Sequence, residues 1–196
     1  MKIGLMGGTF DPIHNMHIAL AKSAAAECGL DRVIFMTAGN TPHKSGVTDA
    51  AARYEMTRLA VEDIPEFSAS DYEVNLTGYS YSVNTLKYLK GKYPDDEICF
   101  IIGEDSLSYI ENWYRPEEIA RLCTLLVYPR TSEKTLLTLA DRVRERLGAK
   151  IVCINAPVLD ISSTEIRERL KAGGDVSDMV DKKVLKYINE NNLYKR

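Results

Sequence analysis

Two short segments near opposite ends of the chain carry the glycine, histidine, serine, threonine and arginine residues that bind phosphate in proteins. The first extends from Gly7 to His17 and reads GGTFDPIHNMH. Gly7 and Gly8 lack side chains, so a phosphate or a nucleobase can approach the backbone closely. His14 and His17 are three residues apart, and one helical turn would stack both imidazoles on one face. Two imidazoles at the start of a helix suit a polyphosphate, by hydrogen bonding and, where protonated, by charge.

The second segment covers residues 161–167 and reads ISSTEIR. Ser162 followed by Glu165 is a capping box, which predicts that a helix begins here with its first N–H groups pointing outward. Arg167 lies near the start of this helix, where its guanidinium offers a fork of donors to phosphate oxygens. Ser162, Ser163 and Thr164 add hydroxyl donors at the positive end of this helix. The two segments together predict a clamp on a polyphosphate.

Each segment also has a purely structural interpretation. A glycine pair after a strand is typical of a tight turn, with the two histidines capping a helix, and Ser162 can cap an ordinary surface helix. The glycines Gly4, Gly7 and Gly8, with no Lys after them, match neither the P-loop nor the GxGxxG pattern. The sequence contains no HExxH, and no carboxylate or cysteine completes a tetrahedral set with the two histidines. No protein-bound metal site is therefore predicted.

Strand and helix patterns alternate along the whole chain and indicate how these segments are positioned. Near-continuous apolar runs predict strands buried on both faces, at residues 2–6, 32–37, 97–102, 124–128 and 150–154, with a less apolar edge strand at 67–75. Helical patterns occupy residues 15–28, 49–63, 81–91, 116–123, 133–147, 163–172 and 178–191. This alternation predicts the α/β class, as a doubly wound, Rossmann-like open parallel sheet with helices on both faces. Residues 1–196 are expected to form one domain, with a C-terminal helical subregion at 160–196.

The segments rich in Gly, His, Pro and Ser follow the predicted strands. They begin at Gly7, Gly39, Gly103, Pro129 and Ile161. In open α/β sheets, ligands bind in the crevice outside the carboxyl ends of the strands. The sequence therefore predicts a single ligand site at this edge of the sheet.

The composition fits a globular protein and excludes several classes of function. Of the 196 residues, 45% are apolar and 27% charged, which is not the composition of a disordered chain. The 25 Lys and Arg against 28 Asp and Glu give a formal net charge of −3, which argues against nucleic acid or a membrane as a partner. No signal peptide or membrane span is recognisable, and the four cysteines form no ligand pattern, so we expect a cytoplasmic protein with reduced thiols. The sequence leaves open whether the chain forms a homo-oligomer.

The two phosphate-binding segments resemble the signatures of a nucleotidyltransferase superfamily that carries (T/H)xxH and ISSTxxR motifs. Both motifs are long, and both match in full. Within that superfamily the chain is similar to the bacterial nicotinate-nucleotide adenylyltransferases over nearly its whole length. Further matching pieces are NTPHK from Asn40, RYEM from Arg53, YSVNTL from Tyr81, GEDSL from Gly103, Trp113, and the tail from Tyr187 to Tyr194.

The resemblance implies an enzyme that transfers the adenylyl group of ATP to nicotinate mononucleotide with Mg²⁺, giving deamido-NAD and pyrophosphate in NAD biosynthesis. It implies that ATP is held by Gly7, Gly8, Thr9, Phe10, His14, His17, Ile161, Ser162, Ser163, Thr164 and Arg167, with the adenosine part near Gly103 and Asp105. The mononucleotide would contact Asn40, Lys44, Thr85, Trp113 and Tyr114. On this hypothesis the catalytic residues, which stabilise the transferring and leaving phosphates, are His14, His17 and Arg167.

The sequence departs from the family pattern at two places. Met16 stands where the family usually has glycine before the second histidine, which is closer to the eukaryotic nicotinamide mononucleotide enzymes. Pro129-Arg130 reverses the Arg-Pro order that usually follows the strand at 124–128. The sequence therefore leaves open whether Arg130 contacts the triphosphate.

Other interpretations stay open on sequence alone. The acceptor could be nicotinamide mononucleotide or phosphopantetheine, although chain length, Thr85 and Trp113 disfavour the latter. The chain could be a regulatory α/β domain, but such a domain would not need the intact motifs that this sequence has. It could also be a fragment related to class I aminoacyl-tRNA synthetases, but such a fragment would show a KMSKS-like segment and a basic extension. The pair Trp113-Tyr114 could stack on a pyridine ring, or the Trp could close the edge of the core. Asp105 could simply cap the helix after Gly103.

Overall fold

Six parallel strands pair side by side in the computed structural model, which describes residues 1–40, 46–130, 132–155 and 161–195. Their order across the sheet is β3-β2-β1-β4-β5-β6. The strands are β1 (Lys2–Gly8), β2 (Arg32–Thr37), β3 (Phe67–Ser70), β4 (Glu97–Gly103), β5 (Thr124–Tyr128) and β6 (Lys150–Cys153). The order runs outward from β1 in both directions, as in doubly wound sheets. The predicted fold class is confirmed.

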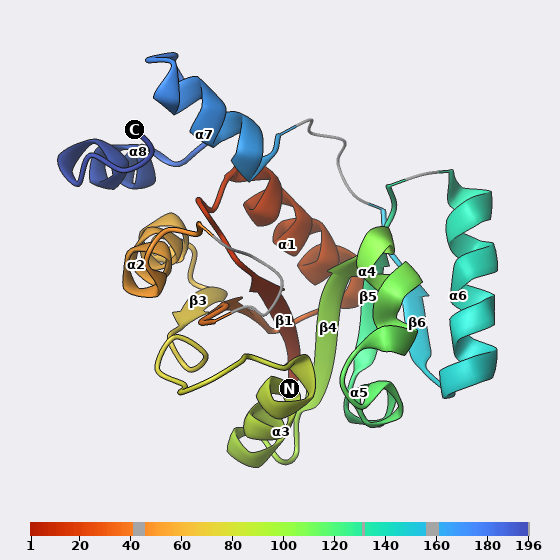
Figure 1. Ribbon diagram of the computed structural model, residues 1–196. Coiled ribbons are helices and arrows are strands. Elements are labelled where there is room, and N and C mark those ends of the chain that lie inside the picture. Colours follow the sequence, from red (N-terminus) through yellow and green to blue (C-terminus); the bar gives the residue numbers. More distant parts are fainter. Residues whose placement is uncertain (41–45, 131, 156–160, 196) are drawn as a thin grey trace.

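Helices cover both faces of the sheet (Figure 1). One face packs against α1 (Asn15–Cys28), α2 (Ala50–Val61), α7 (Ser163–Lys171) and α8 (Lys182–Glu190). The other face packs against α3 (Ser82–Lys92), α4 (Glu104–Tyr109), α5 (Pro116–Leu122) and α6 (Glu133–Leu147). None of the helices in the described part of the chain is both long enough and apolar enough to cross a membrane.

Strand β1 shows how one apolar strand contributes to two cores. Ile3 and Leu5 belong to the core under α3 to α6, whereas Met6 belongs to the core under α1, α2, α7 and α8. Successive side chains of a strand point to opposite faces, so a strand covered on both sides is apolar throughout. Gly4 interrupts the run because a Cβ there would lie 2.8 Å from Cδ1 of Leu30.

The predicted helices and strands all form, with differences at three places. The strand predicted at 67–75 ends at Ser70, although it does lie at the predicted sheet edge. The helix predicted at 178–191 starts four residues late, because the Asp181 side chain caps it by accepting from the backbone N–H of Lys183. The helix expected after Gly103 forms as α4, but its bounds were not predicted, and neither was a 3-10 turn at Ile110–Asn112, since segments of six and three residues are too short to show a period.

One buried cation fixes the loops that follow β1 and β2. Arg53, in α2, is 3% exposed, and its guanidinium donates four hydrogen bonds to main-chain carbonyls. Nη1 reaches Thr9 O and Ala38 O, each at 2.7 Å, Nη2 reaches Gly39 O at 3.0 Å, and Nε reaches Thr48 O at 2.8 Å. The carboxyl ends of two neighbouring strands and the start of α2 are thereby held in one arrangement.

We expect Arg53→Met to lower the free energy of unfolding by roughly 3 to 5 kcal/mol, because several buried carbonyls lose their donor. Urea denaturation measures this loss. The matched control is Arg58→Met on the same helix, where the side chain is 42% exposed and pairs with the surface residues Glu55 and Glu62. That change should cost less than about 1 kcal/mol. Equal losses in the two variants would contradict the assigned role of Arg53.

Candidate active site

The loop after β1 is shaped by a buried aromatic ring. Phe10 is 2% exposed and has φ of 49°, in the left-handed region that non-glycine residues rarely adopt. A Cβ at Gly8 would lie 2.5 Å from Cε1 of Phe10, so glycine is required there by packing. Sequence reasoning placed Gly8 and Phe10 directly against ATP, and the structure shows that Gly8 also makes room for the ring. The Phe10 ring itself lies in the core, edge-on to His17 at 5.0 Å between centroids.

The two histidines meet at the start of α1, as the spacing predicts. His14 is the N-cap residue and His17 occupies the third helical position. Their rings stack with centroids 3.7 Å apart and planes 29° apart. The main-chain N–H of His14 donates to Nδ1 of His17 at 3.2 Å, which fixes the orientation of the second ring.

His14 is a neutral imidazole at pH 7. It is 5% exposed, and burial together with the nearby charge of Arg130 lowers its pKa from 6.5 to about 4. Its Nδ1 is buried and has no hydrogen-bond partner among the described residues. The charge that sequence reasoning allowed for this residue is therefore absent near neutral pH, and His14 can act through hydrogen bonding only.

Helix α7 begins beside the start of α1 (Figure 1). Ser162 caps it by accepting from the N–H of Glu165 at 3.1 Å, whereas the Glu165 carboxylate accepts from Arg169 instead of closing the predicted capping box. Ser163 Oγ donates to Pro12 O at 2.9 Å. The loop before α1 and the N-terminus of α7 are thus joined directly.

These two helix starts line one cavity of about 610 Å³, here called the clamp cavity. Its described lining residues are Gly8, Thr9, Phe10, Asp11, His17, Gly46, Val47, Ser163, Thr164 and Arg167. Arg167 donates to Asp11 O at 2.7 Å and to Thr164 Oγ1 at 3.3 Å. The positive ends of two helices, a guanidinium and hydroxyl donors converge on this space, which suits an anionic ligand. Both sequence segments contribute to it.

A second pocket, of about 270 Å³, adjoins the clamp cavity at the carboxyl ends of β1 and β4; it is called the strand-edge pocket below. Gly8, Thr9 and His17 line both spaces, and the second also includes Gly7, Thr85, Gly103 and Trp113. Trp113 is half-buried and packs on Phe100 at 6.2 Å between centroids, so it closes the core edge and faces the pocket at once. The interpretation in which Trp113 closes the core edge is confirmed, and stacking on a pyridine ring stays a prediction.

The floor of the strand-edge pocket contains a buried carboxyl group that sequence reasoning missed. Glu73 is 8% exposed and lines the pocket, and it accepts a hydrogen bond from Thr85 Oγ1. Burial raises the pKa of this carboxyl. The backbone of Glu73 also explains a glycine, because a Cβ at Gly39 would lie 2.0 Å from Glu73 O. The residue lies in a polar turn of the sequence, where no local pattern marks it as buried.

Seven residues assigned to ATP or mononucleotide from the sequence either line neither space or are outside the described chain: His14, Asn40, Lys44, Asp105, Tyr114, Ile161 and Ser162. Asn40 is exposed and bridges to Tyr79 rather than lining either space. Tyr114 is 50% exposed and its ring contacts Tyr81 at 4.9 Å. Ile161 packs on the core beneath α7. Lys44 falls outside the residues that the structure describes.

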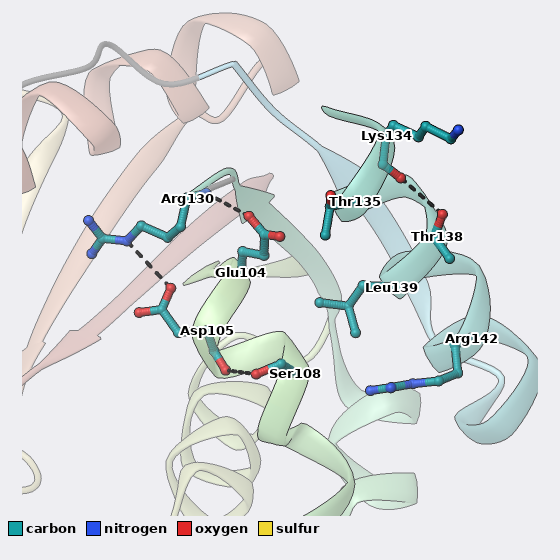
Figure 2. A pocket seen from close by; sticks show the side chains of 9 residues that line it. All are labelled: Glu104, Asp105, Ser108, Arg130, Lys134, Thr135, Thr138, Leu139 and Arg142. Atoms are coloured by element: carbon teal, nitrogen blue, oxygen red, sulfur yellow. Dashed lines mark hydrogen bonds and ion pairs between the residues drawn. The ribbon is translucent and has the colours of Figure 1, made fainter. Parts of the chain in front are cut away.

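Asp105 faces a different cleft, of about 720 Å³, between α4 and α6 (Figure 2). Figure 2 shows its carboxylate directed at the Arg130 guanidinium, with Oδ1 3.5 Å from Nε. The helix that follows β4 is capped by Gly103, and Asp105 lies within its first turn, so the alternative in which Asp105 is the cap is wrong. Arg130 lines this cleft, not the described wall of the clamp cavity, yet it lies close enough to lower the pKa of His14.

The departure at Met16 lies away from these spaces. Met16 is 8% exposed and belongs to the core beneath α1. A side chain in place of glycine at this position therefore adds apolar packing and leaves the face of α1 that carries the two imidazoles unchanged.

Comparison with known proteins agrees with this geometry. The profile of the cytidylyltransferase-like family matches residues 5–169. A relative from Clostridium botulinum (strain Kyoto / Type A2), named "Probable nicotinate-nucleotide adenylyltransferase", is 44% identical over 97% of this chain and 98% of its own. A relative of the same name from strain Eklund 17B is 42% identical over 99% and 98%. The chain therefore belongs to the cytidylyltransferase-like family and, within it, to the nicotinate-nucleotide adenylyltransferases.

Solved structures share the fold. Plasmodium falciparum nicotinic acid mononucleotide adenylyltransferase complexed with NaAD has a TM-score of 0.79 at 21% identity, covering 98% of this chain and 97% of that one. The same enzyme complexed with APC has a TM-score of 0.77 at 20% identity, covering 98% and 96%. The whole described architecture, including the C-terminal helices, is thus shared with enzymes of this class.

The depressed pKa of His14 predicts an acid-sensitive contribution to stability. Between pH 6.5 and about 4 the unfolded chain binds a proton at this residue that the folded chain excludes, so the free energy of unfolding falls as pH falls. Between pH 7.5 and 4.5, we expect the free energy of unfolding of the wild type to fall by roughly 3 kcal/mol more than that of His14→Asn. Urea denaturation at the two pH values measures this difference. Titration of the His14 ring followed by NMR is the direct check. A midpoint near the ordinary value would refute the prediction.

Proposed function

We propose that this chain transfers the adenylyl group of ATP to nicotinate mononucleotide, giving deamido-NAD and pyrophosphate as a step of NAD biosynthesis. The observation that carries the proposal is the junction of two spaces. The clamp cavity gathers two helix N-termini and Arg167, and the strand-edge pocket beside it offers an aromatic wall at Trp113. His17 lines both. Two ligands bound there would meet at this residue, and the names of the relatives specify a nicotinate nucleotide and an adenylyl transfer.

The reaction needs alignment and charge stabilisation more than proton transfer. An oxygen of the mononucleotide 5′-phosphate attacks the α-phosphorus of ATP, and a new P–O bond forms. The bond from the α-phosphorus to the bridging oxygen breaks, and pyrophosphate leaves with the electron pair. Because the attacking phosphate is already an anion at pH 7, no general base is required. The protein has to hold two polyanions in line and stabilise the charge that moves onto pyrophosphate.

The residues of the clamp cavity are suited to this task. Arg167 supplies a permanent positive charge, and the first N–H groups of α1 and α7 supply fixed dipoles. His14 is outside the described wall of the cavity and stacks on His17; it is neutral, and its buried Nδ1 has no described partner. We assign that nitrogen to a phosphate oxygen, which would satisfy a group that is costly to leave unpaired. His17 would contact the transferring phosphate.

The strand-edge pocket would take the nucleoside part of the acceptor. The half-buried Trp113 presents a flat apolar surface on which a pyridine ring can stack. Thr85 lies in the first turns of α3, and its hydroxyl is already engaged by Glu73, which leaves backbone N–H groups of this helix start for an anionic carboxylate. A carboxylate on the pyridine is therefore better accommodated than an amide.

Mg²⁺ would enter with the triphosphate. Magnesium prefers oxygen ligands and commonly binds through substrate phosphates and water. Asp11, a carboxylate in the described wall of the clamp cavity, already accepts hydrogen bonds from Tyr194 and from the N–H of Thr48. The other donors fit phosphate oxygens. We therefore propose that the β- and γ-phosphates hold the ion, which would neutralise their charge.

We place the reaction in the cytoplasm. All four cysteines are free thiols in the structure, and Cys99 and Cys123 are buried. Burial raises the pKa of both thiols, which keeps them protonated and unreactive near neutral pH. A chain of this kind suits a reducing compartment.

The first test is pyrophosphate release with ATP and Mg²⁺, run in parallel on nicotinate and nicotinamide mononucleotide. We expect turnover with a strong preference for nicotinate. Comparable rates would show that the start of α3 does not distinguish the acid from the amide. Absence of turnover with both, in a protein that is folded by circular dichroism, would refute the proposed function.

The role of His17 is tested by His17→Asn, which keeps a side-chain acceptor for the N–H of His14. We expect kcat to fall by roughly a hundredfold or more, because a donor to the transition state is lost. Lys22→Ala, at an exposed position of the same helix, is the control and should leave kcat unchanged. A loss of only a few-fold in His17→Asn would show that this imidazole does not act on the transferring phosphate.

A further inference from the structure

The C-terminal tail of the chain contacts the loop that precedes α1. The hydroxyl group of Tyr194, which follows α8, donates to Asp11 Oδ1 at 2.6 Å. Asp11 is 7% exposed, and the two residues are separated by 183 positions in the sequence. Sequence reasoning treated the tail only as part of a family resemblance and gave Tyr194 no role.

Asp11 also contacts two other groups at the wall of the clamp cavity. Its Oδ2 accepts from the N–H of Thr48 at 3.3 Å, and its main-chain carbonyl accepts from Nη1 of Arg167 at 2.7 Å. The side-chain contacts decide how the Asp11 peptide is oriented. The orientation of that peptide in turn decides where its carbonyl holds the guanidinium of Arg167.

The hydrogen bond from Tyr194 persists throughout the neutral pH range. Burial and the neighbouring Asp11 carboxylate both raise the pKa of the phenol, so it remains a donor across the neutral range. A bond to an ionised, buried acceptor is stronger than one between neutral groups. Tyr194 also adopts φ of 63°, an uncommon conformation for a residue with a side chain, which directs the ring back toward the loop.

The tail does not depend on this bond for its attachment. Lys183, in α8, pairs with Glu62 at 2.7 Å and with Asp63 at 2.6 Å, at the end of α2. Val184 and Ile188 are fully buried in the core that α8 shares with α2. Removing one hydroxyl from Tyr194 therefore leaves α8 in place and changes only what happens at Asp11.

We propose that Tyr194 is a positioning residue for the triphosphate: through Asp11, it holds the carbonyl that directs the Arg167 guanidinium into the clamp cavity. The proposal rests on the function proposed above for the same cavity. It assigns to the end of the chain an effect on ATP, with no effect on the acceptor, because Tyr194 lies on the side of the clamp cavity away from the strand-edge pocket.

The test is Tyr194→Phe, with initial rates measured against ATP at saturating nicotinate mononucleotide and then with the substrates exchanged. We expect kcat/KM for ATP to fall by about tenfold, as for loss of a hydrogen bond to a charged group, while KM for the acceptor changes less than about twofold. Tyr187→Phe is the matched control, since it removes a phenol hydroxyl from α8 while its ring stays packed on the same core. It should behave as the wild type.

Two outcomes would overturn the proposal. Wild-type kinetics in Tyr194→Phe would show that the hydrogen bond does not position anything that ATP contacts. Equal losses of kcat/KM for both substrates, together with a lower urea midpoint, would show that the hydrogen bond only stabilises the fold.

Calorimetric titration with ATP separates this inference from the proposed function. If the wild type releases no pyrophosphate with either mononucleotide, the proposed reaction fails, yet ATP affinity can still be compared between the wild type and Tyr194→Phe. Weaker ATP binding by about tenfold in the variant supports the positioning role, and equal binding refutes it.

Discussion

A single buried guanidinium holds the loops on which the rest of the site depends. The carbonyls at the carboxyl ends of neighbouring parallel strands need donors once helices cover the sheet, and Arg53 supplies them from α2. Its fourth bond, to Thr48 O, fixes the segment whose N–H contacts Asp11. Asp11 then holds Arg167 through its carbonyl. The position of the residue proposed to stabilise phosphate thus depends on hydrogen bonds that begin at a residue which itself lines neither cavity.

The positive character of the clamp cavity arises from helix ends and Arg167, and His14 beside it adds no charge at neutral pH. Burial that brings His14 against His17 also removes the proton from His14 at neutral pH, because an ionised imidazole is costly to desolvate. Backbone N–H groups carry no such cost, since they remain donors at every pH. A site built in this way can bind a polyanion over a wide pH range and yet release pyrophosphate, because few full charges hold it.

Packing decided between interpretations that the sequence left open. Gly8 was read as a place for close approach of phosphate, and the structure adds that the Phe10 ring occupies the space a side chain would need. Met16 departs from the family pattern, but it points into the core. Asp105 was grouped with the ATP-binding residues, and it faces a separate cleft with Arg130. In each case the residue type was informative, and the neighbours that give it a role come from distant segments.

The sequence by itself determined the sheet, nearly all the helices and the two motifs that form the clamp cavity. Buried parallel strands must be continuously apolar, and helix ends need local caps, so both leave marks within a few residues. It could not determine the bounds of the short helix α4, the burial of Glu73, or the bond between Tyr194 and Asp11, two residues that are 183 positions apart. Such contacts have no local pattern, because they are made by segments that meet only after the sheet has formed. Tertiary structure alone decided them.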